Sequence, residues 1–571
     1  MRWWPTHWLP APLRARFADA AAPDHRFADQ LLAGLRARPH RGTRVRDRGA
    51  KDAHRVLAGE LRLRTGSTVR LGPDFAVDWT TPFASRRSSN LLHFFSLEYV
   101  AGLLAAHEAD GDERYLQAAV GIVRSFLDHL DASLADRTAI LQLRGSDSND
   151  HATSKRTSVL LDFAATLLRL EREPALARRT AALLHVHMRY LLDDRNYVGN
   201  NHGVMADLAL AELGMALGAE APDGRACIDK ANGRLCDAVT RIFDADGYAF
   251  ENTIGYHRFN LALFRSALER FSACGIGGRF AEVAPPILAR ADEALRYCVW
   301  PDGGIPPIGD SQVFRKAAKS IDRPRLFAES HFAVIKSPEF YLSFVCGRRG
   351  KSHKHVDDTS VTLRFAGRDV LIDGGAYNYD GEDPYRRCLS SSFGHSGIFP
   401  ERLESLQRRD YHRLQPEARI VEWTEHPRGV VTAGEVRFPA WGILVQRRIE
   451  VRWPGAVLIE DSVTAEGGSS DITARQAWLL GQEATVTHDA AVEGVRVVLV
   501  KTGDVEASFR LGCAGGEPMD KAYRGVQAPP YRGWCSQARG QVAPTTELAR
   551  YLTGRRLRFR AEIALTAARP S

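Results

Sequence analysis

The spacing of apolar residues changes once along this chain, near residue 320. Before that point apolar residues recur every three or four positions, in segments of roughly 15 to 20 residues separated by loops. After it, short runs alternate apolar with polar residues between Gly- and Asp-containing turns. A chain of 571 residues is too long for one ordinary hydrophobic core. We therefore expect an α-helical domain over residues 1–320 and an antiparallel β domain over residues 321–571.

The first half is expected to consist of paired helices. Helical periodicity covers residues 88–106, 115–130, 153–171, 174–192, 201–217, 225–243, 257–274 and 281–299. A series of antiparallel helix pairs, in which neighbours bury a shared core, is typical of an (α/α) toroid or solenoid. No repeat is visible in the sequence, so this prediction depends on the order of elements. The turn-rich residues 300–311 end the helical half.

The second half is expected to form a β-sandwich. Strand-like alternation covers residues 332–335, 340–345, 419–423, 430–433, 443–451, 456–463, 495–500 and 557–565. Many short strands with tight turns are typical of two antiparallel sheets packed face to face. The predicted fold class is thus a multidomain α-then-β protein, an incomplete (α/α) toroid followed by a sandwich.

Residues 352–379 contain the densest set of chemically informative positions. His353 and His355 are two apart, so on a strand they would share a face. A hairpin through Gly367 would bring Asp373 back beside His355, and His395 could complete a His/Asp/His set of the kind that binds zinc. The histidines could equally be polar residues at a strand start, because no local pattern fixes a third ligand.

Three further positions carry candidate chemistry. Asn201 and His202 precede an apolar periodic run, where asparagine also serves as a helix cap. Tyr256 stands at the head of a predicted helix, where a tyrosine more often packs with its hydroxyl satisfied. His151 and Arg156 follow a polar run and could line a cleft, although polarity at a helix start explains them as well.

Together these motifs resemble the heparinase II/III-like polysaccharide lyases, a family that includes heparan-sulfate and oligoalginate lyases. The likeness rests on H-x-H-x-D-x-x-S at 353–360, I-D-G-G-x-Y at 372–377 and G-H-S at 394–396. N-N-H-G at 200–203 and E-x-x-x-x-Y-H at 251–257 extend it into the first half. The resemblance implies the same toroid and sandwich, with a cleft between them.

The resemblance also implies roles for individual residues in a lytic reaction. Such a reaction removes the C5 proton beside the carboxylate of a uronate and expels the O4 glycosidic oxygen. Groups that donate hydrogen bonds to the carboxylate stabilise the enolate-like state. The implied set is Asn201 and His202 on the carboxylate, Tyr256 as general acid, Tyr385 as general base with Tyr377 and Tyr379 as alternatives, and His353, Arg156 and His151 towards the substrate.

The resemblance further implies a structural Zn²⁺ held by His355, Asp373 and His395. A structural role follows because β-elimination consumes no water. No organic cofactor is expected. The second aspartate of H-x-H-x-D-D-T-S, Asp358, departs from the common family pattern.

Composition restricts the partners. A net charge of +8 favours an anionic partner at long range. No basic helix, zinc finger or RNA-binding signature is present, so we expect an acidic polysaccharide and no nucleic acid. The 8 cysteines form no C-x-x-C pair, which argues against a cysteine zinc site or a disulfide scaffold. The sequence gives no indication of oligomeric state.

No membrane span is expected, because no apolar run reaches roughly 20 residues. The first residues lack the continuous apolar segment of a secretory signal, which predicts a cytoplasmic location, or a periplasmic one if the N-terminus is incomplete.

Two other functions fit the same sequence. A glycoside hydrolase on the same toroid would need a pair of carboxyl groups, and no such pair stands among the motif residues. A non-catalytic protein that binds acidic polysaccharide would tolerate degraded Tyr and His positions, whereas these are intact. Heparan, chondroitin, alginate and bacterial exopolysaccharide substrates are not distinguished, nor is endo from exo action.

Overall fold

The computed structural model describes residues 25–37, 49–83, 87–135, 149–273, 275–466, 471–492 and 494–568. The chain separates into two compact units. Unit 1 comprises the described residues up to Val239 together with Leu263–Ala284, and unit 2 comprises Thr240–Ala262 and the residues from Pro285 onward. Helices give way to strands between α13 (Arg279–Cys298) and β3 (Arg325–Phe327), where the sequence predicts the change.

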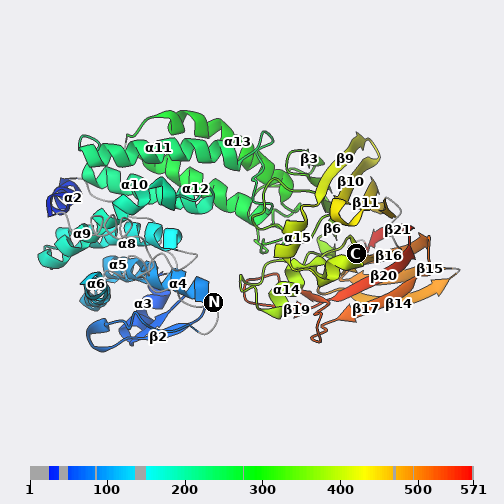
Figure 1. Cartoon of the computed structure of the whole chain (residues 1–571), viewed down its shortest axis with the longest axis horizontal. Coiled ribbons are helices and arrows are strands. Elements are labelled where there is room, and N and C mark those ends of the chain that lie inside the picture. The colour runs from blue at the N-terminus through cyan, green and yellow to red at the C-terminus, as the bar shows by residue number, and fades with distance from the viewer. Residues whose placement is uncertain are drawn as a thin grey trace. The chain divides into compact units, whose positions relative to one another are not determined.

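The helical half contains the helices predicted from periodicity, except that residues 88–106 form two helices (Figure 1). Its elements are α2 (His25–Ala37), α3 (Gly49–Leu57), β1 (Glu60–Arg62), β2 (Thr68–Arg70), α4 (Arg87–Phe95), α5 (Glu98–Asp110), α6 (Glu113–Ala135), α8 (Asn149–Arg169), α9 (Pro174–Leu192), α10 (Asn201–Leu217), α11 (Pro222–Ile242), α12 (Ile254–Ala273) and α13. None of these described helices is long and apolar enough to span a bilayer.

One predicted helix is broken. Residues 88–106 were expected to be continuous, but the chain forms α4 and α5 with Leu97 between them. Leu97 has φ 56°, in the left-handed region that a leucine rarely adopts, and its side chain is fully buried. Apolar spacing continues across the break because Leu97 packs inward, so periodicity alone could not reveal it.

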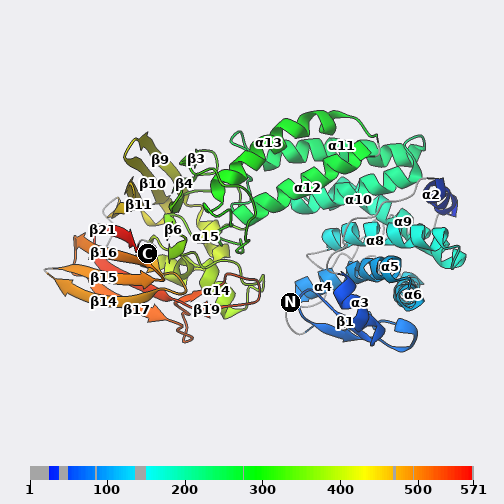
Figure 2. The same ribbon diagram turned by 180° about the vertical axis from the view of Figure 1, so that it is seen from behind.

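Helix α10 packs against three other helices of unit 1, α2, α8 and α9. Helices α8, α9 and α10 lie side by side in both views (Figure 1 and Figure 2). Its buried side chains surround the helix, which is the pattern of a helix enclosed by others. Asn201, the first residue of α10, is therefore part of a helix that other helices surround.

The strands of unit 2 form three larger antiparallel sheets within the described residues. One sheet runs β3, β4 (Phe332–Ser337), β5 (Phe340–Val345), β6 (Ser360–Phe365), β7 (Arg368–Leu371). A second has the order β14 (Thr485–Val492), β15 (Val495–Thr502), β16 (Val505–Ala514), β21 (Arg556–Ala567), β12 (Ala456–Ala465), β11 (Ile443–Arg452), β10 (Gly429–Phe438), β9 (Glu417–His426). The third has the order β17 (Met519–Arg524), β20 (Thr546–Gly554), β13 (Ile472–Leu479), β8 (Ile398–Pro400), and β18 (Trp534–Cys535) pairs with β19 (Ala543–Pro544).

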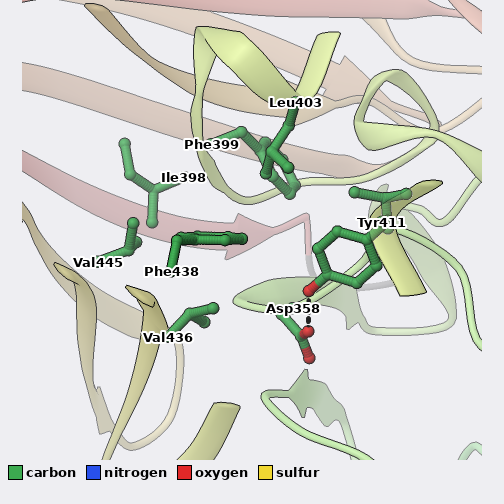
Figure 3. Close-up of a pocket in the computed structure, with 9 residues that line it drawn as sticks. Asp358, Ile398, Phe399, Leu403, Tyr411, Val436, Phe438 and Val445 are labelled. Carbon is green, nitrogen blue, oxygen red and sulfur yellow. Dashed lines mark hydrogen bonds between the residues drawn. The ribbon is translucent and has the colours of Figure 1, made fainter. Parts of the chain in front are cut away.

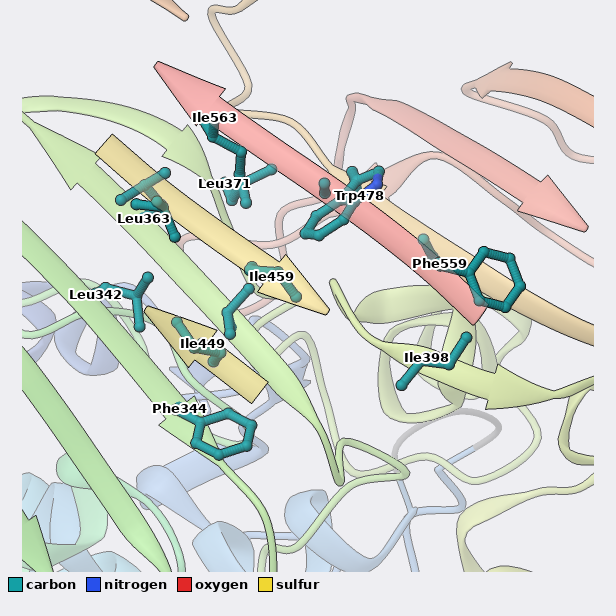
Figure 4. Packing of buried hydrophobic residues seen from close by; sticks show 14 of the residues in the cluster. Leu342, Phe344, Leu363, Leu371, Ile398, Ile449, Ile459, Trp478, Phe559 and Ile563 are labelled. Atoms are coloured by element: carbon teal, nitrogen blue, oxygen red, sulfur yellow. The ribbon is translucent and has the colours of Figure 1, made fainter. Parts of the chain in front are cut away.

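The three larger sheets share one apolar core. Strand β21 alternates buried and exposed residues along most of its length, as a strand with one solvent face should. Side chains from all three sheets meet in the cluster of Figure 4, among them Leu342, Ile449, Trp478 and Phe559. This packing of antiparallel sheets on a common core confirms the predicted β-sandwich.

The predicted hairpin around Gly367 is present as β6 and β7. Ala366 and Gly367 have φ 45° and 76°, the positive values required by a two-residue type I′ turn. The turn returns the chain to Asp373. The expectation that His353 and His355 lie on a strand is wrong: both precede β6, which starts at Ser360, and His353 has φ 58°.

Candidate functional site

In unit 2, His353 and His355 converge on the carboxylate of Asp310. Nδ1 of His353 lies 3.0 Å from Oδ2, and Nε2 of His355 lies 2.9 Å from Oδ1. Asp310 is buried and comes from the turn-rich segment that follows α13. The two histidines thus share a partner through an irregular loop rather than through a common strand face.

Arg386, on α14 (Pro384–Ser390), donates to both oxygens of the same carboxylate. Burial alone would raise the pKa of Asp310, but Arg386 and the two histidines hold that pKa well below its usual range. An ionised carboxylate only accepts hydrogen bonds, so Nδ1 of His353 and Nε2 of His355 are the nitrogens that donate. Asp310 therefore fixes the tautomer of both rings when they are neutral.

Tyr256 lies in the first turn of α12, against His353. The two rings stack with centroids 3.5 Å apart and planes 16° from parallel. The Tyr256 hydroxyl is 2.6 Å from the hydroxyl of Tyr379. Burial raises the pKa of Tyr256 to about 12, although the hydrogen bond to Tyr379 acts in the opposite direction. Tyr256 is consequently protonated at neutral pH.

Tyr385 lies in a different aromatic cluster from Tyr256. Its ring makes edge contacts with Tyr377, Tyr531 and Trp534. Its hydroxyl accepts a hydrogen bond of 2.8 Å from Nε2 of Gln527. The sequence offers Tyr385, Tyr377 and Tyr379 as the base. Of these three, Tyr379 is the one whose hydroxyl is hydrogen-bonded to the hydroxyl of Tyr256.

His355, Asp373 and His395 gather as the sequence predicts. All three are buried, and one candidate ligand atom from each lies within 4.8 Å of the others. Nδ1 of His395 is 2.9 Å from Oδ2 of Asp373. Such a buried His/Asp/His group could hold a metal ion.

The ring nitrogens fit a metal. Nδ1 of His355 and Nε2 of His395 are buried and have no hydrogen-bond partner in the described part of the chain. For His355 the other nitrogen, Nε2, donates to Asp310, so its Nδ1 carries a lone pair when the ring is neutral. A lone pair in this state, with its ring oriented by a carboxylate, is the usual form of a metal-binding histidine.

The glycines after Asp373 allow this site to form. Gly375 has φ 71°, and a Cβ there would lie 2.2 Å from the carbonyl oxygen of Ser536. The backbone N–H groups of Gly309 and Gly375 donate to Oδ1 of Asp373 at 3.1 and 3.0 Å. The I-D-G-G sequence thus brings the backbone close enough to orient the carboxylate.

In unit 1, the two asparagines at the start of α10 have separate tasks. Asn200 is the cap, since its side-chain oxygen accepts from the backbone N–H of His202 at 2.9 Å. Asn201 follows as the first helical residue and is 6% exposed; because Asn200 provides the cap, the Asn201 amide is not needed for it. Nδ1 of His202 is 3.1 Å from Oδ2 of Asp150.

Gly203 completes this motif for a steric reason. A Cβ there would lie 2.2 Å from the Val198 carbonyl oxygen and 2.8 Å from the Tyr197 ring. No residue larger than glycine fits that approach without a backbone shift.

His151 and Arg156 differ in their surroundings. The His151 ring lies 4.7 Å from the His202 ring, and burial lowers the pKa of His151 to about 3, which keeps it neutral. Arg156 is fully buried; it donates to the Phe95 carbonyl oxygen at 2.6 Å and to Nε2 of His187 at 3.3 Å. No part of Arg156 reaches the surface, so we replace the predicted substrate contact with a structural role.

Two aspartates gain a role that sequence reasoning missed. Asp310 stands in a run of turn residues, and nothing in its sequence neighbourhood connects it to histidines about 45 positions away. Asp358 is buried and accepts hydrogen bonds from Lys354 Nζ at 2.8 Å, from the Gly347 N–H at 2.8 Å and from the Tyr411 hydroxyl. The second aspartate of the motif is thus explained by the packing of the loop.

A small pocket beside Asp358 is not the functional site. It is lined by apolar side chains including Phe399, Val436 and Phe438, with Tyr411 and Asp358 at one side (Figure 3). Its free volume of about 10 Å³ is near the minimum for one water molecule. A saccharide cannot enter it.

Comparisons with known proteins bear on the C-terminal half of the chain and on its fold. Residues 322–568 match the family model described as heparinase II/III-like, C-terminal. A comparison with curated proteins gives no match. Among solved structures, a heparinase III has a TM-score of 0.72 at 13% identity, over 97% of this chain and 91% of that one.

Two further structures are similar over nearly the whole chain. The heparinase III BT4657 gene product has a TM-score of 0.66 at 16% identity, over 98% of this chain and 92% of its own. The heparan sulfate lyase HepC from Pedobacter heparinus has a TM-score of 0.60 at 14% identity, over 98% and 88%. The chain therefore has the architecture of heparinase III, a helical toroid followed by an antiparallel β-sandwich, and residues 322–568 form a heparinase II/III-like C-terminal domain.

Proposed function

We propose that this chain is a polysaccharide lyase that cleaves a uronic-acid-containing polysaccharide by β-elimination. The domain match, the fold and the occurrence of a heparan sulfate lyase among the similar structures support it. The observation that carries it is the stacking of His353, held by Asp310, on the protonated Tyr256.

The reaction needs one base and one acid. The base takes the proton from C5, the electron pair of that C–H bond forms the C4–C5 double bond, and the C4–O4 bond breaks. The acid gives a proton to the departing O4 oxygen. Neither a nucleophile nor water enters the products.

Tyr256 is proposed as the acid. Because burial raises its pKa to about 12, it carries its proton at neutral pH and is ready to donate. Its hydroxyl is hydrogen-bonded to the hydroxyl of Tyr379, a residue that is 44% exposed to solvent.

His353 is proposed as the base. Asp310 occupies Nδ1, which leaves Nε2 with a lone pair that can take the C5 proton. Asp310 would then stabilise the imidazolium, as the aspartate does in other Asp–His catalytic pairs. Tyr385 remains the base predicted from the sequence; its hydroxyl bonds Gln527 and lies in the other aromatic cluster, so the geometry favours His353.

Asn201 and His202 are proposed to bind the uronate carboxylate. An amide N–H and an imidazole N–H that donate to the carboxylate would stabilise the charge that develops there as the proton leaves C5. The hydrogen bond of His202 to Asp150 orients its ring for this task. His151, which packs against His202, would contact the same substrate region.

The metal is proposed to be Zn²⁺ held by His355, Asp373 and His395. When bound, it would join the loop that carries His353 to the segments after β7 and α14. All of the proton transfers described above are assigned to side chains.

The test is ultraviolet absorbance over time with heparan sulfate, chondroitin, alginate and bacterial exopolysaccharides. A new unsaturated-uronate band with one of them, lost in Tyr256→Phe, is expected. Reducing sugar without that band would mean hydrolysis, and the absence of any product, with retained binding, would mean a non-catalytic polysaccharide-binding protein.

A further inference from the structure

The carboxylate of Asp310 joins two histidines to which the proposed function gives different tasks. Its Oδ2 accepts from the proposed base, His353, at 3.0 Å, and its Oδ1 accepts from the proposed metal ligand, His355, at 2.9 Å. Arg386 donates to both oxygens and so fixes the plane of the carboxylate. All four residues are buried or nearly so, and all belong to unit 2.

The hydrogen bonds determine which nitrogen of each ring is left to act. Since an ionised carboxylate only accepts, neutral His353 has its lone pair on Nε2 and neutral His355 has its lone pair on Nδ1. The first atom is the one that a base uses. The second is buried without a hydrogen-bond partner in the described residues, which suits a metal ligand.

We propose that Asp310 is a positioning residue that couples the two sites, so that one carboxylate orients His355 for the metal and His353 for proton abstraction. The inference rests on the proposed function: the base half needs the lyase reaction, whereas the metal half needs only the proposed zinc site and can be tested without lyase activity. The consequence is that a change at Asp310 alters metal affinity and turnover together.

A simpler explanation is that Asp310 only neutralises the buried guanidinium of Arg386. That role needs neither histidine, and it predicts that loss of the carboxylate lowers stability alone. The two explanations therefore differ in what they predict for metal affinity and for kcat.

The experiment compares Asp310→Asn with Asp244→Asn. Asp244 is also a buried aspartate of unit 2; its carboxylate accepts from the Ser330 hydroxyl at 2.7 Å and the Tyr248 N–H at 2.7 Å, and none of its described partners is a histidine. It reports the general cost of removing a buried carboxylate. Metal affinity is measured with Zn²⁺ in competition with a chromophoric chelator, and kcat and KM are measured on the substrate that the wild type cleaves.

We expect Asp310→Asn to bind Zn²⁺ about 10- to 100-fold more weakly than the wild type. We expect kcat to fall by about 10²- to 10⁴-fold, with KM changed by no more than about threefold, because the ring of the base loses its orientation. In histidine-labelled protein, the Nδ1–H resonance of His353, assigned with His353→Gln, should disappear. Asp244→Asn should change none of these quantities.

The proposal is overturned if Asp310→Asn matches Asp244→Asn, or if kcat falls while Zn²⁺ affinity stays at the wild-type value. If Asp310→Asn does not fold, Arg386→Lys is used instead, because it keeps the carboxylate but removes the two-point hydrogen bonding that holds it. This variant must lower Zn²⁺ affinity and kcat together. If the wild type cleaves no uronate polysaccharide, the proposed function fails, and Zn²⁺ affinity and the His353 resonance still decide whether Asp310 couples the sites.

Discussion

The ring of His353 stacks on the ring of Tyr256, with centroids 3.5 Å apart and an angle of 16° between the planes. Asp310 accepts a hydrogen bond from Nδ1 at the edge of the same histidine ring. The contact joins a residue at the start of α12 to a loop almost 100 positions later in the chain, both within unit 2. It places a protonated hydroxyl and an oriented imidazole in one site.

Tyr256→Phe should remove activity without removing this contact. The phenylalanine ring keeps the stacking on His353, so we expect the free energy of unfolding to change by about 1 kcal/mol or less. Loss of the acid should lower kcat by about 10²- to 10⁴-fold. Steady-state kinetics and thermal unfolding of the same preparation test this, and a variant that keeps a tenth of wild-type kcat would exclude Tyr256 as the acid.

The identity of the base can be decided by three substitutions. His353→Gln should lower kcat by about 10²-fold or more, because His353 is the imidazole that stacks on Tyr256 and is held by a carboxylate. Tyr385→Phe removes only a hydroxyl that accepts from Gln527, so a change of less than about tenfold is expected.

Tyr379→Phe removes the partner of the Tyr256 hydroxyl and should give an intermediate loss. If Tyr385→Phe abolishes turnover while His353→Gln does not, the assignment from sequence is right and the one from geometry is wrong.

Gly375→Ala should disrupt the buried His/Asp/His group. Its φ of 71° costs an alanine about 1 to 2 kcal/mol, and the new Cβ would lie 2.2 Å from the Ser536 carbonyl oxygen. We expect a lower midpoint of thermal unfolding and weaker Zn²⁺ binding. Gly381→Ala, where a Cβ meets nothing within 4 Å, is the control and should change stability by about 0.5 kcal/mol or less. Equal unfolding curves for the two variants would contradict this account of the I-D-G-G sequence.

Glu98 should make stability depend on pH in the acid range. Burial alone would raise its pKa, but His93, Lys155 and Arg64 hold the pKa below its ordinary value of about 4.3. A carboxyl whose pKa is lower in the folded state stabilises the fold above the unfolded pKa, and this contribution is lost as pH falls towards the folded pKa.

Glu98→Gln should therefore cost about 3 kcal/mol at pH values near 7 and progressively less below about pH 4. Denaturant unfolding of both proteins across this range tests the expectation. A difference between them that does not change with pH would show that the charge of Glu98 is not what stabilises this region.

The secondary structure was largely predictable because it depends on local spacing. Helices such as α9 and α10 and strands such as β5 and β21 begin and end within a few residues of the predicted positions. In each, apolar side chains at a fixed interval have to face a core, and that interval is visible in the sequence. The break at Leu97 was not visible, since its apolar side chain fits the helical pattern while its backbone does not.

The candidate site was predictable only in part, for a related reason. The grouping of His355, Asp373 and His395 was expected and is present; the β6–β7 hairpin returns Asp373 to His355, whereas the place of His395 was implied only by the family resemblance. Asp310 was missed because its approach to His353 depends on the tertiary path of a long turn segment. Arg156 was expected to contact the substrate because it is a polar residue near the start of a helix. Its position in the sequence does not reveal that its side chain is completely buried.

The most direct test of the central claim is to digest the cleaved polysaccharide in water enriched in heavy oxygen and to analyse the products by mass spectrometry. β-Elimination adds no water, so the account predicts that the product carrying the new non-reducing end is lighter than the corresponding hydrolysis product by one water molecule and contains no heavy oxygen at that end. A new non-reducing end with the mass of a saturated residue, one water molecule heavier than the elimination product, would show that water enters the reaction and would contradict the assignment of this chain as a lyase.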